Sequence, residues 1–274
     1  MLKRQNVLIR KELLLIFLFI IMFVLISSFR LYFLIWIVNA PLLLLVYKKP
    51  LKRAVILALI PIILSVAISF IWVVRYGWST YFISSIIISS FLFLFAMIFN
   101  ILSKKATGYS RIFIAPFVWS ILMLIYSFSI INSYWADWSM FNPMMTPLIW
   151  FVGCNGVTFL MILMHSIIIF YIVKRDKKIL LTGIIIILAM AGNYGYSHYA
   201  EPEGRRAKVA LLQGNFNQSL DWRQANAKGL IFDVYENLSI TAAKSKPSII
   251  VWPEYAIAAD SLNDKNLTDR LSVL

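Results

Sequence analysis

The 274-residue sequence has few side chains that can form disulfides, bind metals or carry charge. There is one cysteine, there are two histidines, and charged residues make up 14% of the chain. A lone Cys154 excludes a disulfide framework and a cysteine-based metal site. His165 and His198 have no second histidine or carboxylate at ligand spacing, so we expect no bound metal. Acidic residues are also scarce, with 12 Asp and Glu against 26 Lys and Arg.

Apolar residues dominate instead, at 61% of the chain, which is typical of membrane proteins. Apolar runs of about 17 residues or more predict membrane-spanning helices, because backbone polar groups in lipid must be satisfied within the helix. We count seven such runs: 13–29, 31–47, 54–74, 79–102, 112–131, 148–173 and 179–196. The sequence therefore predicts a membrane all-α bundle of about seven transmembrane helices over residues 1–196.

The net charge of +14 does not indicate nucleic-acid binding, because the positive excess lies in short loops between apolar runs. Basic residues are dense at the amino terminus and after the second, fourth and sixth runs. The other loops hold Arg30, Arg75 or no basic residue. By the positive-inside rule the amino terminus is cytoplasmic, and seven spans put the residues after 196 in the periplasm of a Gram-negative cell. One span more or fewer would reverse that side.

After a polar connector, 197–206, the pattern changes to strand, helix, strand, helix. We predict strands at 208–213 and 248–251, a helix at 222–244 and another from about 262. The first of these helices has an apolar stripe at Leu230, Val234, Leu238 and Ala242. This order indicates a parallel α/β unit, but 207–274 is short of the roughly 100–150 residues of a usual domain. We expect an incomplete domain, from a longer protein or from a product cut short.

Glu254 directly follows the second predicted strand. Pro253 ends that strand, because proline cannot donate to a sheet, and open α/β sheets carry their chemistry at the carboxyl ends of strands. The neighbours Trp252 and Tyr255 are apolar or aromatic, so we expect a poorly solvated carboxylate with a raised pKa, suited to act as a general base. A surface acid that closes a strand is an equally good interpretation of the residue type alone.

Two segments resemble a known family. IIVWPEYAI (249–257) resembles the glutamate segment of the carbon–nitrogen hydrolase (nitrilase) superfamily. VALLQGNFNQSLDW (209–222) resembles the segment that opens this domain in a membrane-bound branch, the apolipoprotein N-acyltransferases. The order of a multi-span region followed by the glutamate segment also resembles that branch. The resemblance implies a nitrilase-like αββα sandwich, truncated here, for 207–274.

The resemblance also implies roles for particular residues. Glu254 would take a proton from a cysteine nucleophile, a lysine would bind the oxyanion, and Trp222 would lie near a lipid-binding pocket, although a structural role for Trp222 is equally consistent. The lysine and cysteine are expected downstream of Leu274. Cys154 lies in an apolar run and Lys265 follows Glu254 too closely, so neither matches.

The implied reaction transfers an acyl chain from a membrane phospholipid, through a thioester, to the amino-terminal diacylglyceryl-cysteine of a lipoprotein. It needs no metal or soluble cofactor and takes place at the bacterial inner membrane. We expect the chain to be inactive alone, because its nucleophile is absent. The alternatives are a non-catalytic membrane remnant, one half of a split enzyme, or a transporter, for which the expected internal repeats or paired broken helices are not evident.

Overall fold

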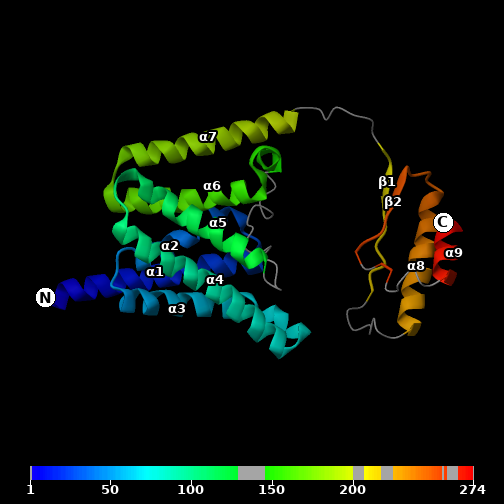
Figure 1. The fold of residues 1–274 in the computed structure, drawn as a ribbon, viewed down its shortest axis with the longest axis horizontal. Helices are drawn as coiled ribbons and strands as arrows, with labels where there is room; N and C mark the ends of the chain where they lie inside the picture. Colours follow the sequence, from blue (N-terminus) through cyan, green and yellow to red (C-terminus); the bar gives the residue numbers. More distant parts are fainter. Residues whose placement is uncertain are drawn as a thin grey trace. The chain divides into compact units, whose positions relative to one another are not determined.

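The computed structural model (Figure 1) describes residues 2–128, 146–199, 207–216, 225–254, 256–257 and 265–273. The chain divides into two compact units, Met1–Glu201 and Pro202–Leu274. The finer division into a bundle at 1–196, a connector at 197–206 and an incomplete domain at 207–274 stays a prediction.

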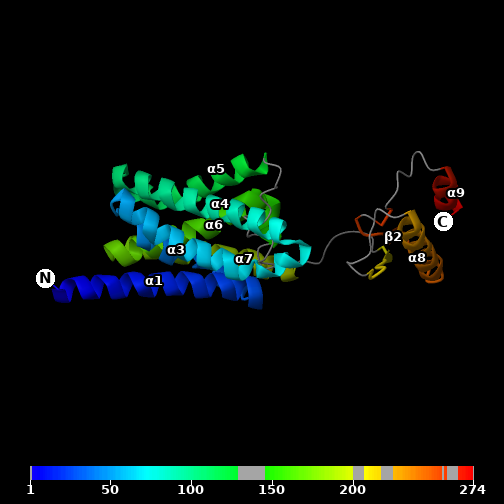
Figure 2. The same ribbon diagram turned by 90° about the horizontal axis from the view of Figure 1, so that it is seen from below.

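The first unit is a helical bundle. Its α-helices are α1 (Leu2–Phe29), α2 (Asn39–Val46), α3 (Leu51–Ser69), α4 (Trp78–Lys105), α5 (Ile114–Ser127), α6 (Thr146–Lys174) and α7 (Lys177–Tyr199). Three 3-10 helices join them: η1 (Tyr32–Trp36), η2 (Ile71–Tyr76) and η3 (Gly108–Phe113). In Figure 2, α1 lies along one side of this unit next to α3, with which it packs.

Five helical segments among the described residues are long and apolar enough to cross a membrane. They are Val7–Phe29, Leu51–Ser69, Trp78–Lys105, Gly108–Ser127 and Leu148–Lys174. α7 fills the seventh predicted run with 23 helical residues but is not among these five. The predicted membrane-helical region is observed, whereas the count of seven spans is not confirmed.

The second predicted span, 31–47, is not one continuous helix. It consists of η1 followed by α2, which has only eight residues. At 1.5 Å per residue α2 is about 12 Å long, against a hydrocarbon core of about 30 Å. Pro41 lies in the first turn of α2 and has no N–H to bond back into the preceding segment, so the helix starts anew there. α2 is almost entirely buried and packs against α1, α3, α4 and α6.

Polar side chains from two long helices donate hydrogen bonds to backbone carbonyls of this broken segment and of the loop after it. Asn100 of α4 donates from Nδ2 to the carbonyls of Val46 and Lys49, the second at 3.1 Å. His165 of α6 donates from Nε2 to the carbonyl of Ile35 at 2.8 Å. Non-helical backbone within a membrane is tolerated where protein buries and satisfies it. His165 therefore supports the break between η1 and α2, whereas Asn100 satisfies carbonyls at the carboxyl end of α2.

Aromatic packing fixes the centre of the bundle. Trp119 of α5 is fully buried, and its ring meets those of Phe91 and Phe95 of α4 edge-on, at 4.9 Å in both cases. Such edge-to-face pairs contribute beyond the area they bury. α4 and α5 are thus locked together in the core.

The second unit has the predicted order of elements. These are β1 (Val209–Leu211), α8 (Ala225–Ala243), β2 (Ile249–Val251) and α9 (Lys265–Val273). The strands pair in parallel, with Val209 opposite Ile249. The outward side chains of this two-stranded sheet, Val209, Leu211, Ile249 and Val251, are exposed. A complete nitrilase-like sandwich is not confirmed among the described residues.

The apolar stripe predicted for α8 is wrong at Leu230, which is 52% exposed. Its other members, Val234, Leu238 and Ala242, are half-buried, and Leu238 packs against the core of this unit. The most buried positions are Ile231, Phe232 and Tyr235, because the rings of Phe232 and Tyr235 pack against Trp252, which follows β2. Aromatic contacts thus centre the buried face beside the predicted aliphatic stripe.

Candidate functional site

Glu254 lies at the carboxyl end of β2, as predicted. The strand ends at Val251, and a turn follows in which the Ala256 N–H donates to the Pro253 carbonyl at 3.2 Å. Glu254 is within this turn. The side chain therefore projects from the edge of a parallel sheet where α/β proteins carry their chemistry.

Trp252 fixes the start of this turn. Its ring stacks on Tyr235 of α8 at 5.4 Å, and its Nε1 donates to the Ser239 hydroxyl at 2.9 Å. A buried tryptophan needs such a partner for its N–H. Because two contacts hold the indole against α8, the backbone that enters the Glu254 turn has little freedom.

The turn after β1 rests on the same tyrosine. The Gly214 N–H donates to the Tyr235 hydroxyl at 3.2 Å, and the Phe216 ring lies 5.8 Å from the Tyr235 ring. A Cβ at Gly214 would lie 2.3 Å from the Phe216 ring, so any other residue would require that ring to move. Asn215 has a φ of 49°, which asparagine tolerates better than most residues. Tyr235 thus brings the turns after both strands to one edge of the sheet.

The apolar pocket predicted around Glu254 is not formed by the described residues. Glu254 and Pro253 are both exposed. The physical reason is the orientation of Trp252, whose indole is held against α8 and so cannot cover the carboxylate. Any shielding of Glu254 has to come from groups outside the described part of the chain.

The other predicted site residues are not brought to this edge. Trp222 lies outside the described residues. Lys265 is exposed at the first position of α9. Cys154 belongs to the membrane unit, half-buried in α6, where it follows a kink at Gly153. Within the described residues there is no group of three or more His, Cys, Asp or Glu side chains that could hold a metal ion.

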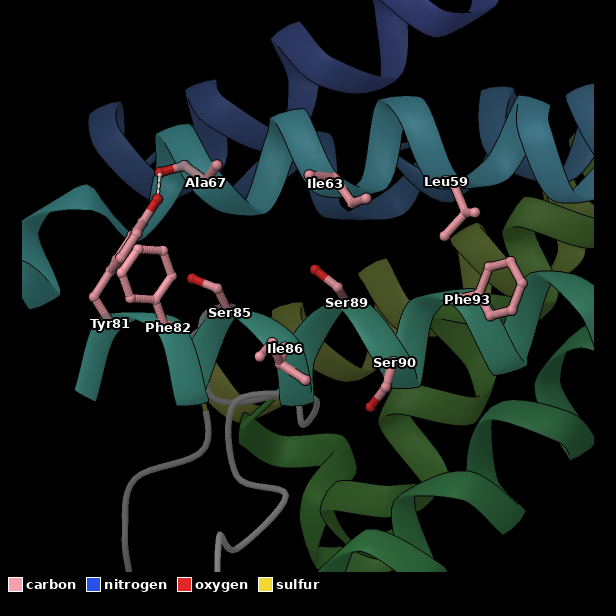
Figure 3. A pocket seen from close by; sticks show the side chains of 10 residues that line it. All are labelled: Leu59, Ile63, Ala67, Tyr81, Phe82, Ser85, Ile86, Ser89, Ser90 and Phe93. Atoms are coloured by element: carbon pink, nitrogen blue, oxygen red, sulfur yellow. Dashed lines mark hydrogen bonds between the residues drawn. The ribbon is translucent and has the colours of Figure 1, made fainter. Parts of the chain in front are cut away.

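A groove in the membrane unit was missed by the sequence analysis. It lies between α3 and α4, has a volume of about 390 Å³, and is lined mainly by apolar side chains (Figure 3). Leu59 and Ile63 line one wall, and the hydroxyls of Ser85 and Ser89 point from α4 towards α3. The sequence feature that could have predicted this groove is the pair Ser85 and Ser89, two small residues four positions apart on one face of α4.

The Tyr81 side chain crosses this groove near the start of α4. Its hydroxyl donates to the Ala67 carbonyl at 3.0 Å (Figure 3). The Ser85 hydroxyl is buried without a hydrogen-bond partner in the described part of the chain. The groove is therefore mainly apolar, with the buried Ser85 hydroxyl as an unsatisfied donor inside it. Its volume lies at the lower end of the range for sites that bind small molecules.

Comparison with characterised proteins gives a consistent result. The chain is 28% identical over 245 residues to the apolipoprotein N-acyltransferase of Geobacter metallireducens, covering 81% of this chain and 46% of that protein. It is 38% identical over 85 residues to that of Neisseria meningitidis serogroup A, covering 30% and 16%, and 28% identical over 162 residues to that of Vibrio vulnificus, covering 57% and 30%. No protein-family model matches the chain.

These matches cover the chain better than they cover the relatives. The chain spans about half the length of the curated relatives it matches, with 46% of the Geobacter protein aligned. Helices of spanning length and relatives from bacteria make it a bacterial membrane protein. The resemblance to the apolipoprotein N-acyltransferases is confirmed over most of the chain.

Proposed function

We propose that the chain provides the membrane region and the general base of an apolipoprotein N-acyltransferase. The observation that carries this proposal is Glu254, which follows a parallel strand on a turn braced by Trp252 and Tyr235. The names of the relatives support lipoprotein N-acylation at the level of the family. The acyl donor would be a membrane phospholipid and the acceptor the amino-terminal diacylglyceryl-cysteine of a lipoprotein.

In the proposed reaction Glu254 moves protons between the reacting groups. It removes the proton from a cysteine thiol as the sulfur attacks the ester carbonyl of the phospholipid. The ester C–O bond breaks, and the proton passes to the leaving alkoxide, which gives a lysophospholipid and a thioester. The amine of the lipoprotein then attacks the thioester, and its proton returns the thiol to its starting form. An oxyanion donor, expected to be a lysine, stabilises both tetrahedral intermediates.

The groove between α3 and α4 supports contact with a lipid donor. Its walls are hydrocarbon, from residues such as Leu59, Ile63 and Phe93, and it lies between two helices of spanning length. An acyl chain carries no polar groups, so burying it against these walls would leave no polar group of the acyl chain without a hydrogen-bond partner. The hydroxyl of Ser85 could donate to an ester carbonyl of that lipid.

We further propose a multi-pass inner-membrane protein with a cytoplasmic amino terminus and a periplasmic carboxyl-terminal unit. The basic loops before α3, after α4 and between α6 and α7 gather at one end of the bundle (Figure 1), which is the arrangement that the positive-inside rule attributes to the cytoplasmic side. The break between η1 and α2 does not alter this assignment, because the chain still returns to the basic end before α3 begins.

The test is a chimaera in which residues 1–274 replace the equivalent part of the Geobacter relative. Purified chimaera is supplied with phospholipid and a diacylated lipopeptide, and triacylated product is measured. Glu254→Gln should lower the rate by about 10²–10⁴-fold, the usual contribution of a general base. Asp269→Asn removes an exposed carboxylate elsewhere in the same unit and should leave the rate unchanged. Equal rates for the Glu254→Gln and parent chimaeras would contradict the proposal.

The same assay distinguishes the enzyme from a non-catalytic protein. We predict that the 274-residue chain alone gives no product, because its single cysteine, Cys154, belongs to a membrane helix. Turnover above a no-enzyme control would contradict this. The alternative of a split enzyme is favoured by the exposed outer face of the β1–β2 sheet, which a second chain could cover. In that case a separately expressed carboxyl-terminal portion should restore activity.

A further inference from the structure

One end of the membrane unit carries a dense group of exposed cations. The turns that meet there lie before α3, after α4 and between α6 and α7 (Figure 1). We define the basic face as Lys48, Lys104, Lys105, Lys174, Arg175 and Lys177, all of which are exposed. At the opposite end, the turns between the described helices carry only Arg30 and Arg75 as basic residues.

Specific contacts hold these turns together. The Tyr47 ring, at the end of α2, meets the Phe170 ring of α6 edge-on at 5.7 Å. The Tyr109 hydroxyl of η3 donates to Asp176, between α6 and α7, at 2.6 Å. Ile112 and Ile179 belong to the same buried cluster as Phe170. The cations therefore project from a fixed framework rather than from independent loops.

The acidic residues near this face are already engaged. Glu12 accepts from Lys49 and from Arg53, each at 2.8 Å. Asp176 accepts from the Tyr109 hydroxyl and from the backbone N–H of Lys178 in the first turn of α7. None of the six cations of the basic face makes an ion pair with another described residue. Their charge thus remains available to an external anion.

Two of these cations sit on an unfavourable backbone. Lys48 and Arg175 both have a φ of 55°, just beyond the ends of α2 and α6, where glycine is the usual residue. A side chain in this left-handed region costs free energy that glycine would avoid. Each cation also lies over a tyrosine ring, Lys48 over Tyr47 at 5.6 Å and Arg175 over Tyr171 at 6.0 Å. The backbone and the tyrosine ring together orient each of these two charged side chains.

We propose that the basic face binds the headgroups of anionic phospholipids, with Lys48 and Arg175 as its fixed anchors. The helices that carry it are apolar enough to cross a membrane, so their ends lie at headgroup level, where tyrosine is enriched. Clustered lysines and arginines at that level attract anionic lipids. This inference concerns lipid retention and does not rest on acyl transfer or on Glu254.

The experiment measures lipid affinity of the full 274-residue chain in nanodiscs of phosphatidylcholine alone or with added phosphatidylglycerol. Native mass spectrometry reports the phosphatidylglycerol retained. Each cation removed should weaken retention about fivefold, so Lys48→Gln/Arg175→Gln should weaken it about thirtyfold. Arg30→Gln is the matched control, since Arg30 has the same backbone conformation, with a φ of 57°, but belongs to the opposite end. It should retain phosphatidylglycerol as the parent does.

A second variant separates charge from folding. Arg175→Gly should raise the melting temperature in pure phosphatidylcholine, because glycine suits the backbone there, yet should reduce the additional stabilisation by phosphatidylglycerol. Inorganic phosphate in solution should not reproduce that stabilisation, because it lacks the membrane anchor. Unchanged retention in the double variant, equal loss in Arg30→Gln, or an equal effect of free phosphate would each overturn the proposal.

Discussion

The hydrogen bonds from Asn100 to the end of α2, here called the polar clamp, give the most specific stability prediction. Replacing Asn100 with leucine keeps the branching of the side chain but removes the donor that serves the carbonyls of Val46 and Lys49. Asn100 is fully buried, so water cannot easily take its place. A buried acceptor that loses its donor costs about 1–3 kcal/mol, whereas hydrogen bonds within membrane proteins average nearer 0.6 kcal/mol. We therefore expect Asn100→Leu to destabilise the protein by about 1–2 kcal/mol.

Asn39 provides a matched control with the opposite sign. It is also fully buried, but neither its Oδ1 nor its Nδ2 has a hydrogen-bond partner within the described part of the chain. The same substitution, Asn39→Leu, removes two unsatisfied polar atoms and adds apolar contact with the helices around α2. We expect it to leave stability unchanged or to raise it by up to about 1 kcal/mol.

The assay is equilibrium unfolding of each variant in mixed detergent micelles, followed by circular dichroism. Asn100→Leu should unfold more readily than the parent, and Asn39→Leu no more readily. If both substitutions destabilised the protein equally, the loss would reflect packing alone, and the account of the clamp would be refuted. His165→Phe, at the other end of the broken segment, should resemble Asn100→Leu, because it removes the donor to the Ile35 carbonyl.

Three further predictions concern the turns and the second unit. Hydrogen bonds from the Tyr109 hydroxyl and from the start of α7 hold the pKa of Asp176 below its usual range. These bonds therefore stabilise the folded protein above about pH 4, and this stabilisation is lost as the pH falls through the lowered pKa. The melting temperatures of Tyr109→Phe and the parent should therefore differ near neutral pH and converge in acid; a constant difference would contradict this. Arg270 of α9 donates to Asp233 and Glu236 of α8, which raise its pKa, so Arg270→Gln should speed hydrogen exchange in α9 more than in α8. Trp252→Phe should lose about 1 kcal/mol from the bond to Ser239, in addition to the packing of the larger ring, and its total cost should be smaller by about 1 kcal/mol in a Ser239→Ala background.

The pattern of apolar residues and the position of Pro253 predicted much of this structure. Long apolar runs predicted the helices of the bundle, and the change to short strands predicted the β–α–β–α order of the second unit. Pro253 correctly marked the end of β2 and so the position of Glu254. Each of these features depends on the chain's own local pattern, which a single sequence displays directly.

Features that depend on distant contacts were not predictable in the same way. The run 31–47 is apolar enough for a span, but His165 from α6 supports its break and Asn100 from α4 binds the end of α2. The most buried face of α8 follows from aromatic packing onto Trp252, so the predicted aliphatic stripe was wrong at Leu230 and missed Phe232 and Tyr235. The solvation of Glu254 likewise depends on where the indole of Trp252 points. In each case the outcome depends on a contact between residues far apart in the sequence, or on the direction in which a side chain points. Residue type alone reveals neither.

The central claim is that Glu254 activates the nucleophile of a lipoprotein N-acyltransferase. The most direct test is the first half-reaction alone, in which the chimaera carrying residues 1–274 is mixed with phospholipid and no acceptor. A burst of lysophospholipid equal to the amount of enzyme is expected, together with a thioester on the protein, and Glu254→Gln should slow the formation of both by about 10²–10⁴-fold. A full burst at the parental rate from Glu254→Gln would contradict the claim.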